Sequence, residues 1–225
     1  MIELIGLSKS YGKKNVLEDI NLKLQNGMVY GIIGENGAGK TTLFNCIAGM
    51  ESHKGIVYSE LESLKNHLGF LETTPKIMSW VTGKEYLKLL TLARGKSYKD
   101  FKKVNIFDLP LNEYAQYYST GMRKKLALTG ILLQQNDIYI LDEPFSGVDI
   151  ESNMLILEVI KKLKTENKLV IIASHILGTL SGICDQILVL SNRAIDEHVN
   201  PDSFNELERK MTKKFISGKL DGIEF

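Results

Sequence analysis

The chain has 225 residues, which is enough for one domain of ordinary size with a substantial buried core. Hydrophobic residues make up 44% of it, and 28 basic side chains nearly balance 27 acidic ones, a composition that excludes a disordered or collagen-like chain. Because the formal net charge is only +1, no broad positive field is present and we expect no nucleic acid partner.

The N-terminus, Met1-Ile2-Glu3-Leu4, has no basic segment followed by an apolar run, so no secretory signal is visible and the cytosol is expected. The most apolar region, 169–190, is interrupted by His175 and Asp185, among others, and is too broken to form a membrane helix. If a membrane is involved, we expect another chain to cross it.

The first functional motif is a glycine-rich loop. A predicted strand over 28–33 leads into Gly-Glu-Asn-Gly-Ala-Gly-Lys-Thr at 34–41, and a predicted helix over 41–48 follows. Such a loop wraps backbone N–H groups around phosphates, its lysine reaches the β- and γ-phosphates, and its hydroxyl ligates Mg²⁺. We therefore expect a bound nucleoside triphosphate and Mg²⁺, with these nucleotide contacts: Gly34, Asn36, Gly37, Ala38, Gly39, Lys40, Thr41 and Thr42.

Further along, residues 76–135 change to helical spacing, which predicts an inserted helical subdomain. The apolar run 138–141 then predicts a buried strand that ends at Asp142 and Glu143, at the edge of the sheet where ligands of α/β folds bind. Asp142 is predicted to hold Mg²⁺ with Thr41, and Glu143 to act as general base on the attacking water. Alone, such a pair is more often a solvated strand end; beside a phosphate loop, the functional interpretation is favoured.

Another buried strand is predicted over 169–173, followed by an edge hairpin of 186–190 and 194–198 and a short helical tail from 201 to 225. The elements together predict an α/β fold with a mainly parallel sheet. We expect one domain over 1–225, with a nucleotide-binding core at 1–75 and 136–200, the helical subdomain at 76–135, and the tail.

Tyr118-Ser119-Thr120-Gly121-Met122-Arg123 lies between the phosphate loop and Glu143. It resembles the signature sequence of the nucleotide-binding subunits of ATP-binding-cassette (ABC) transporters, in a Tyr-Ser-x-Gly-Met variant, and the resemblance covers nearly the whole chain. It implies a P-loop NTPase (RecA-like) core with an antiparallel N-terminal part, and an ATPase. It also implies a head-to-tail dimer, of two copies or of paired subunits, in which Ser119 and Gly121 close over the partner's ATP.

The same resemblance implies roles for three other residues. Asp149 matches the aspartate of the loop that communicates between the two sites, His175 matches the histidine that contacts the γ-phosphate as a catalytic residue, and Tyr11 matches the aromatic that stacks on adenine. Without the resemblance, each has an ordinary structural interpretation: a turn, a structural histidine and a packing aromatic. Ser119 alone would be a simple helix cap.

Two departures from the family pattern stand out. Gly69-Phe70-Leu71-Glu72-Thr73-Thr74-Pro75 places Thr73, beside Glu72, where the family has a Mg²⁺-sensing glutamine, which leaves open whether Glu72, Thr73 or water completes the metal shell. In the signature, Thr120 replaces a glycine and Met122 the glutamine.

The leading hypothesis is a transport motor, peripheral on the cytoplasmic face of the membrane, that drives a separate transmembrane permease subunit docked near residues 71–80. The signature variant resembles exporter subunits. The alternative is a soluble ABC-type ATPase that acts on a cytosolic assembly, a ribosome or nucleic acid, and a third possibility is a switch with negligible turnover, against which Glu143 argues.

Overall fold

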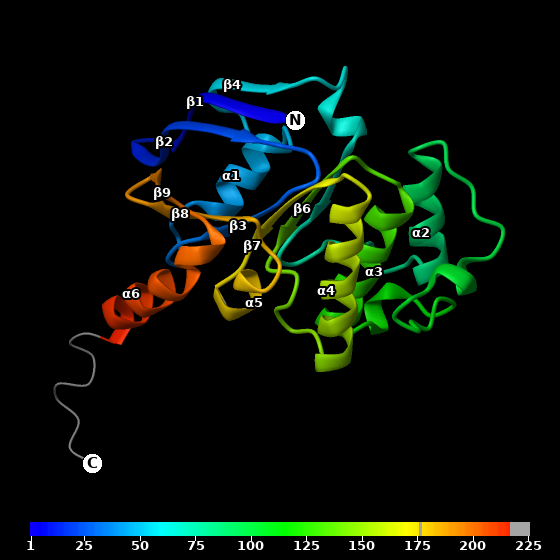
Figure 1. Ribbon diagram of the computed structural model, residues 1–225. Helices are drawn as coiled ribbons and strands as arrows, with labels where there is room; N and C mark the ends of the chain where they lie inside the picture. Colours follow the sequence, from blue (N-terminus) through cyan, green and yellow to red (C-terminus); the bar gives the residue numbers. More distant parts are fainter. Residues whose placement is uncertain (176, 217–225) are drawn as a thin grey trace, which may run out of the picture.

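A six-stranded sheet forms the centre of the structure, a computed structural model that describes residues 1–175 and 177–216 (Figure 1). Its strands occur in the order β5 (Leu68–Leu71), β6 (Ile138–Asp142), β7 (Leu169–Ala173), β3 (Val29–Ile33), β8 (Gln186–Ser191) and β9 (Ala194–Val199). The first five are parallel, and β9 returns antiparallel to β8. The carboxyl ends of β3, β6 and β7 therefore lie at the same end of the sheet. The predicted phosphate loop follows β3, Asp142 is the last residue of β6, and His175 lies just after β7.

A second sheet holds the N-terminal strands. It is antiparallel, in the order β2 (Lys14–Leu24), β1 (Ile2–Tyr11) and β4 (Lys54–Ser59), and it lies over α1 (Figure 1). The prediction of an α/β fold with a mainly parallel sheet and an antiparallel N-terminal part is confirmed.

Helices cover both faces of the central sheet. α1 lies between the two sheets, whereas α2, α3 and α4 cover the other face (Figure 1). The helices are α1 (Lys40–Ile47), α2 (Gly83–Leu92), α3 (Thr120–Leu133), α4 (Ile150–Thr165), α5 (Leu177–Ser181) and α6 (Phe204–Ile216). Short 3₁₀ turns occur at Leu64–Asn66, Phe101–Val104, Ala115–Tyr117 and Pro201–Ser203.

The central strands are buried on both faces. Ile138 and Ile140 of β6 point into the core shared with α1, and Tyr139 and Leu141 point into the core beneath α3 and α4. Each fully buried side chain of this size contributes about 1.5–3 kcal/mol relative to an exposed one. This alternation explains why the strands are apolar at nearly every position, as parallel strands between two helix layers are.

The predicted helical stretch 76–135 is helical mainly at its two ends. α2 begins with a capping box, in which Thr82 and Glu85 satisfy each other's backbone N–H groups. α3 begins at Ser119, whose hydroxyl accepts a hydrogen bond from the Met122 amide at 3.2 Å. Residues 93–119 between the helices hold turns, bends, two 3₁₀ segments and an isolated β-bridge from Tyr114 to Thr82. The division into a core, a helical subdomain and a tail stays a prediction.

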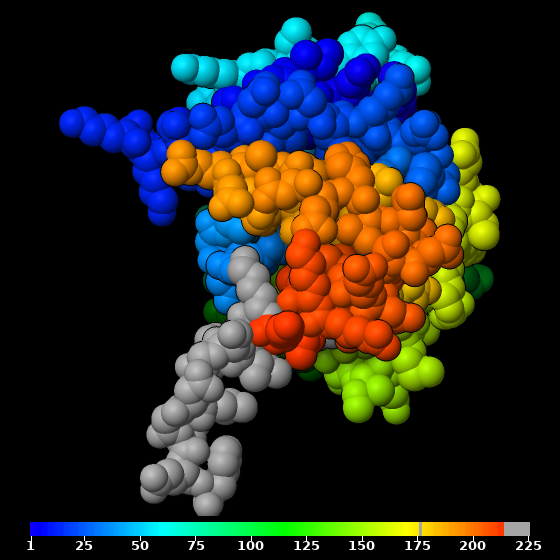
Figure 2. Space-filling view, turned by 60° about the vertical axis from the view of Figure 1, so that its left-hand side comes forward, coloured from blue at the N-terminus to red at the C-terminus, as the bar shows by residue number. Residues whose placement is uncertain are grey.

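The hairpin β8–β9 turns at Asn192 and Arg193, which both have positive φ, as a two-residue hairpin turn requires. Figure 2 shows β8 and β9 (orange) between the N-terminal strands (blue) and α6 (red). On α6, Phe204 and Leu207 are buried and Met211 is half-buried, as their shared helical face predicts. Residues 217–225 of the predicted tail lie outside the described residues.

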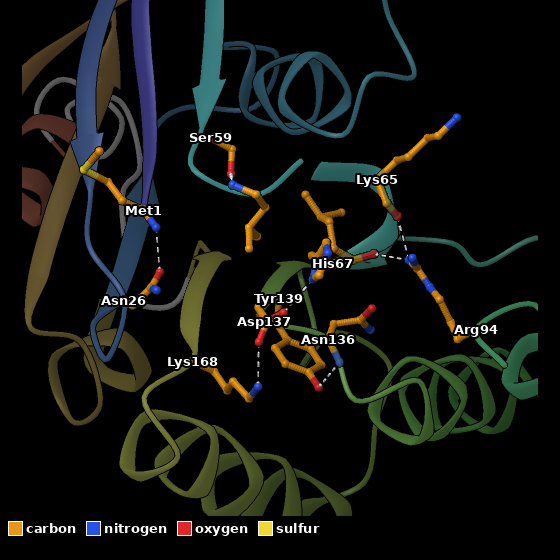
Figure 3. A network of polar contacts seen from close by, with 12 residues as sticks. Met1, Asn26, Ser59, Lys65, His67, Arg94, Asn136, Asp137, Tyr139 and Lys168 are labelled. Atoms are coloured by element: carbon orange, nitrogen blue, oxygen red, sulfur yellow. Dashed lines mark hydrogen bonds and ion pairs between the residues drawn. The ribbon is translucent and has the colours of Figure 1, made fainter. Parts of the chain in front are cut away.

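A polar network lies at the opposite end of the sheet, where β5, β6 and β7 begin (Figure 3). The carboxylate of Asp137 accepts hydrogen bonds from Lys168 at 2.9 Å and from the ring of His67 at 2.7 Å. The Asp137 amide also donates to the carbonyl of His67, and its carbonyl accepts from Leu169. One residue thereby ties the starts of three strands together.

No helix within residues 1–175 and 177–216 is both long and apolar enough to cross a membrane.

Candidate nucleotide site

The phosphate loop joins β3 to α1. Gly39 has φ of +110°, a conformation that other residues rarely adopt, and an added Cβ would lie 2.9 Å from Leu17 Cδ2. The loop can therefore turn into the helix only with glycine at this position. No side chain caps the first turn of α1, so its N–H groups remain available for a phosphate.

The side chain of Lys40 folds back over the loop. Its ammonium donates to the carbonyl oxygens of Gly34 at 2.7 Å and Glu35 at 3.2 Å, and the residue is buried. A buried ammonium requires such partners, and phosphate oxygens, which carry full charge, are stronger acceptors than carbonyls. The arrangement places a cation where the motif requires one.

Asp142 brings two hydroxyl groups together at the end of β6. Its Oδ2 accepts hydrogen bonds from Thr41 Oγ1 at 2.6 Å and from Thr73 Oγ1 at 2.8 Å, and the residue is only 1% exposed. Thr73 is thus the residue of the Glu72–Thr73 pair that reaches the predicted metal ligands.

One carboxylate and two hydroxyls are hard oxygen donors, which suit Mg²⁺. In the described parts of the chain, no group of three or more His, Cys, Asp or Glu side chains could hold a metal ion. The donor set therefore fits a magnesium ion that is shared with substrate phosphates and water, and does not fit a metal held by the protein alone.

Glu143 and His175 meet across the carboxyl ends of β6 and β7. Glu143 Oε2 lies 2.8 Å from His175 Nδ1, and the Glu143 amide donates to the Ala173 carbonyl at 3.0 Å. The backbone of Glu143 has φ of +52°, a left-handed conformation that costs about 1–3 kcal/mol for residues other than glycine. Such conformations concentrate at functional sites, where the surrounding structure enforces them.

A cavity of ≈ 420 Å³ joins the phosphate loop to Asp142 and Glu143, and His175 does not line it. The predicted residues that line it are Asn36, Gly37, Gly39, Lys40, Thr41, Thr42, Asp142 and Glu143. Thr73 lines it as well, and so do Lys14 and Val16 of β2, which sequence reasoning missed. An exposed lysine and a valine on a strand carry no local signal of a binding wall, because only the packing of the N-terminal sheet on α1 brings them there.

Tyr11 lies beside the cavity and does not line it. It pairs with Lys14 at the turn end of the β1–β2 hairpin, and its ring is half exposed. The ammonium of Lys9 lies 4.7 Å from the ring centroid and is held by Glu51 at 2.7 Å. A flat aromatic face fixed next to the cavity is compatible with base stacking, so the role of Tyr11 stays a prediction.

Three predicted residues, Ser119, Gly121 and Asp149, lie away from the cavity lining, at the starts of α3 and α4. Asp149 caps α4 by accepting from the Ser152 amide at 2.8 Å and pairs with Lys125 at 3.0 Å. The Ser152 amide and then Lys125 hold the pKa of Asp149 well below its usual range. Gly121 packs against Gly147, whose carbonyl oxygen would lie 2.5 Å from an added Cβ. Within one chain these residues join α3 to the loop before α4.

Sequence reasoning also missed Lys124, which is 2% exposed. Its ammonium donates to the carbonyl oxygens of Glu143 at 2.7 Å and Ser146 at 2.8 Å. Burial lowers the pKa of Lys124, and the nearby charges of Glu143 and Asp142 oppose that shift. Its place on the same helical face as Leu128 and Ile131 was the signal that could have marked it as buried.

A family model described as "ABC transporter" matches residues 17–146, which hold the loop, the signature segment and the two carboxylates. The chain belongs to the ABC transporter family. It is an ATP-binding subunit and an ATPase of that family, as the signature segment and the motif order predict.

Curated relatives cover the chain almost from end to end. The bacitracin transport ATP-binding protein BcrA of Enterococcus faecalis is 32% identical over 98% of this chain and 76% of its own length. The ABC transporter ATP-binding protein NatA of Bacillus subtilis is 30% identical over 96% of both chains. The lantibiotic transport ATP-binding protein SrtF of Streptococcus pyogenes is 29% identical over 97% of this chain and 99% of its own.

Solved structures share the fold. The ATP-binding subunit of an ABC transporter superposes with a TM-score of 0.81 at 26% identity, over 94% of this chain and 93% of the other. A dimeric ATP-binding cassette in a post-hydrolysis state bound to ADP and Pi gives a TM-score of 0.79 at 19% identity, over 89% and 99% of the two chains.

Proposed function

We propose that this ABC ATPase powers export of a substrate through a separate membrane subunit, that it pairs head to tail with a second copy or a related subunit around two ATP molecules, and that Mg²⁺ is required. The observation that carries the hydrolytic part is the position of Glu143: its carboxylate lines the phosphate cavity and is held by His175.

The residues divide the chemistry among themselves. The loop amides and Lys40 bind the β- and γ-phosphates. Thr41, Asp142 and Thr73 are the residues that would hold the Mg²⁺ ion. Mg²⁺, when bound, neutralises phosphate charge. Glu143 orients the attacking water and accepts its proton, and His175 binds the Glu143 carboxylate. Contact of His175 with the γ-phosphate is what the family resemblance implies.

Pairing of two chains supplies the rest of the site. Ser119 and Gly121 lie at the exposed start of α3, away from the cavity of their own chain. Two small residues at a helix N-terminus can bind a phosphate, so in a head-to-tail dimer they close over the partner's nucleotide. A dimeric cassette among the structures of the same fold supports this arrangement.

The relatives support the transport part of the proposal, and an exposed patch supports the membrane partner. Two of the relatives are ATP-binding proteins named for bacitracin transport and for lantibiotic transport. The chain also carries an exposed apolar surface, here called the aromatic patch, made of Met78, Trp80, Tyr114 and Tyr117. Backbone hydrogen bonds from Ala115 to Val81 and from Gln116 to Ser79 hold its two segments side by side. The patch extends the predicted docking segment at 71–80.

The base role of Glu143 is tested by Glu143→Gln, which keeps the shape of the side chain and removes the proton acceptor. We expect phosphate release to fall by ~10² to 10⁴-fold while ATP affinity stays unchanged, and the variant to accumulate as a dimer in ATP. Turnover equal to that of the wild type would remove Glu143 from this role.

A further inference from the structure

A buried lysine joins the signature helix to the loop that follows β6. Lys124 has two described hydrogen-bond acceptors, the main-chain carbonyls of Glu143 and Ser146. Taking an ammonium out of water is costly unless it is paired, and main-chain carbonyls are fixed partners that cannot swing away as a side chain can. The ammonium and the Glu143–Ser146 turn therefore fix each other.

Glu143 needs this support because of its backbone. A residue other than glycine remains at φ of +52° only where its surroundings enforce that conformation. On one side of its Cα, the amide of Glu143 is bound to the Ala173 carbonyl; on the other, its carbonyl is bound to Lys124 at 2.7 Å. Fixing both peptide groups fixes the direction in which the carboxylate leaves the chain.

We propose that Lys124 is a positioning residue for Glu143: its ammonium holds the peptide group of Glu143 so that the carboxylate faces His175 and the attacking water. The proposal rests on the base role proposed for Glu143. Lys124 does not line the cavity, so it acts through Glu143 and not on the substrate.

Other contacts also join α3 to this loop, so replacement of Lys124 should disturb only the turn at residues 143–146. Gly121 packs against Gly147, and Lys125 pairs with Asp149. Both contacts remain when Lys124 is replaced, so the helix should stay on the loop. What is lost is the hydrogen bonds of the ammonium to the carbonyls of Glu143 and Ser146. The Glu143 carbonyl then keeps only the weaker bond from the Ser146 amide at 3.2 Å, so the direction of the Glu143 carboxylate is less firmly fixed.

The experiment replaces Lys124 with Met, which is unbranched like lysine, one atom shorter, and cannot donate a hydrogen bond. Steady-state phosphate release is expected to show kcat lower by about 10²-fold, the cost of a misplaced catalytic group, with KM and ATP affinity within about twofold of wild type. Ile131→Val is the control, because it removes a buried methylene from the same helix and leaves the hydrogen bonds from Lys124 to Glu143 and Ser146 in place. Its kcat should equal that of the wild type.

A double-mutant cycle distinguishes loss of Glu143 positioning from a general disturbance of the fold. Because Lys124 acts through Glu143, Lys124→Met should lower kcat no further in the Glu143→Gln background. The proposal is overturned if Lys124→Met keeps kcat within about twofold of wild type, or if it causes the same fold-loss in both backgrounds. Wild-type turnover in Glu143→Gln alone would instead refute the base role itself, and the positioning role with it.

If Lys124→Met does not fold, Lys124→Gln decides the matter. Its amide is neutral and shorter but still a donor, so we expect kcat about tenfold below wild type with KM unchanged. Wild-type kcat in Lys124→Gln, or a loss that appears in KM alone, overturns the proposal.

Discussion

The ammonium of Lys40 is already held in place within the phosphate loop, before any nucleotide binds. Its ammonium is buried against the carbonyl oxygens of Gly34 and Glu35, within the loop that carries it. Exchange of these acceptors for phosphate oxygens gains charge–charge attraction without first burying the cation. We therefore expect the lysine to contribute to ATP binding, and not only to the chemical step.

Lys40→Ala is accordingly expected to weaken ATP affinity. Loss of a hydrogen bond to a charged group costs about 1.5–3 kcal/mol, which corresponds to ~10-fold or more in the dissociation constant. Calorimetric or fluorescence titration measures it. Lys96→Ala serves as the control, because Lys96 bonds to Gln135 and does not line the cavity. Equal ATP affinity in Lys40→Ala and the wild type would refute the phosphate contact.

The residues that sequence could identify are those whose spacing is local. Gly34 to Thr42 form one continuous motif, and Asp142 and Glu143 follow one strand directly. Lys14, Val16 and Lys124 could not be found in the same way, because their roles depend on contacts between residues far apart in the chain. Thr73 lies between these cases: its position in the segment was predictable, but its bond to Asp142 was not.

At the scale of elements, Asp137 holds the starts of β5, β6 and β7 at the edge of the sheet away from the site (Figure 3). Burial alone would raise the pKa of Asp137, but hydrogen bonds and charge from Lys168 and His67 outweigh it and lower the pKa below its ordinary value. A lowered carboxyl pKa stabilises the fold above the ordinary value near pH ~4, and this stability is lost as the pH falls through the folded-state pKa.

Asp137→Asn should therefore lower the free energy of unfolding at pH 7, by about 1 kcal/mol or less because the pair is partly exposed. Urea unfolding at a series of pH values measures the difference between variant and wild type. That difference should shrink as the pH falls below ~4, where Asp137 itself loses its charge. A difference that is the same at pH 7 and at pH ~3 would show that the charge of Asp137 does not stabilise the network.

Among the elements, the parallel strands and the final hairpin were predictable, because runs of apolar residues mark strands buried on both faces and Asn192-Arg193 marks a turn. Residues 93–119 were harder. They lie within the predicted helical stretch 76–135, whereas the structure has turns and 3₁₀ segments there. These residues are packed through scattered anchors such as Phe101 and Phe107, which impose no helical period.

At the scale of the whole molecule, one face carries the nucleotide cavity and another segment carries the aromatic patch. Trp80 is 71% exposed and Tyr117 is 69% exposed, although both are large and apolar. A patch of this kind is typical of a surface that meets a partner. We expect the membrane subunit to cover it, since the predicted docking segment ends at Trp80.

The measurement that tests the account most directly is which chain copurifies with this one from detergent-solubilised membranes. We predict a protein with several membrane-spanning helices, bound equally by the wild type and by Tyr58→Asp, a control on the N-terminal sheet. Trp80→Asp should reduce its recovery by about tenfold or more, as loss of a buried aromatic anchor does. Recovery of ribosomes or nucleic acid in place of a membrane protein, or full recovery with Trp80→Asp, would contradict the account.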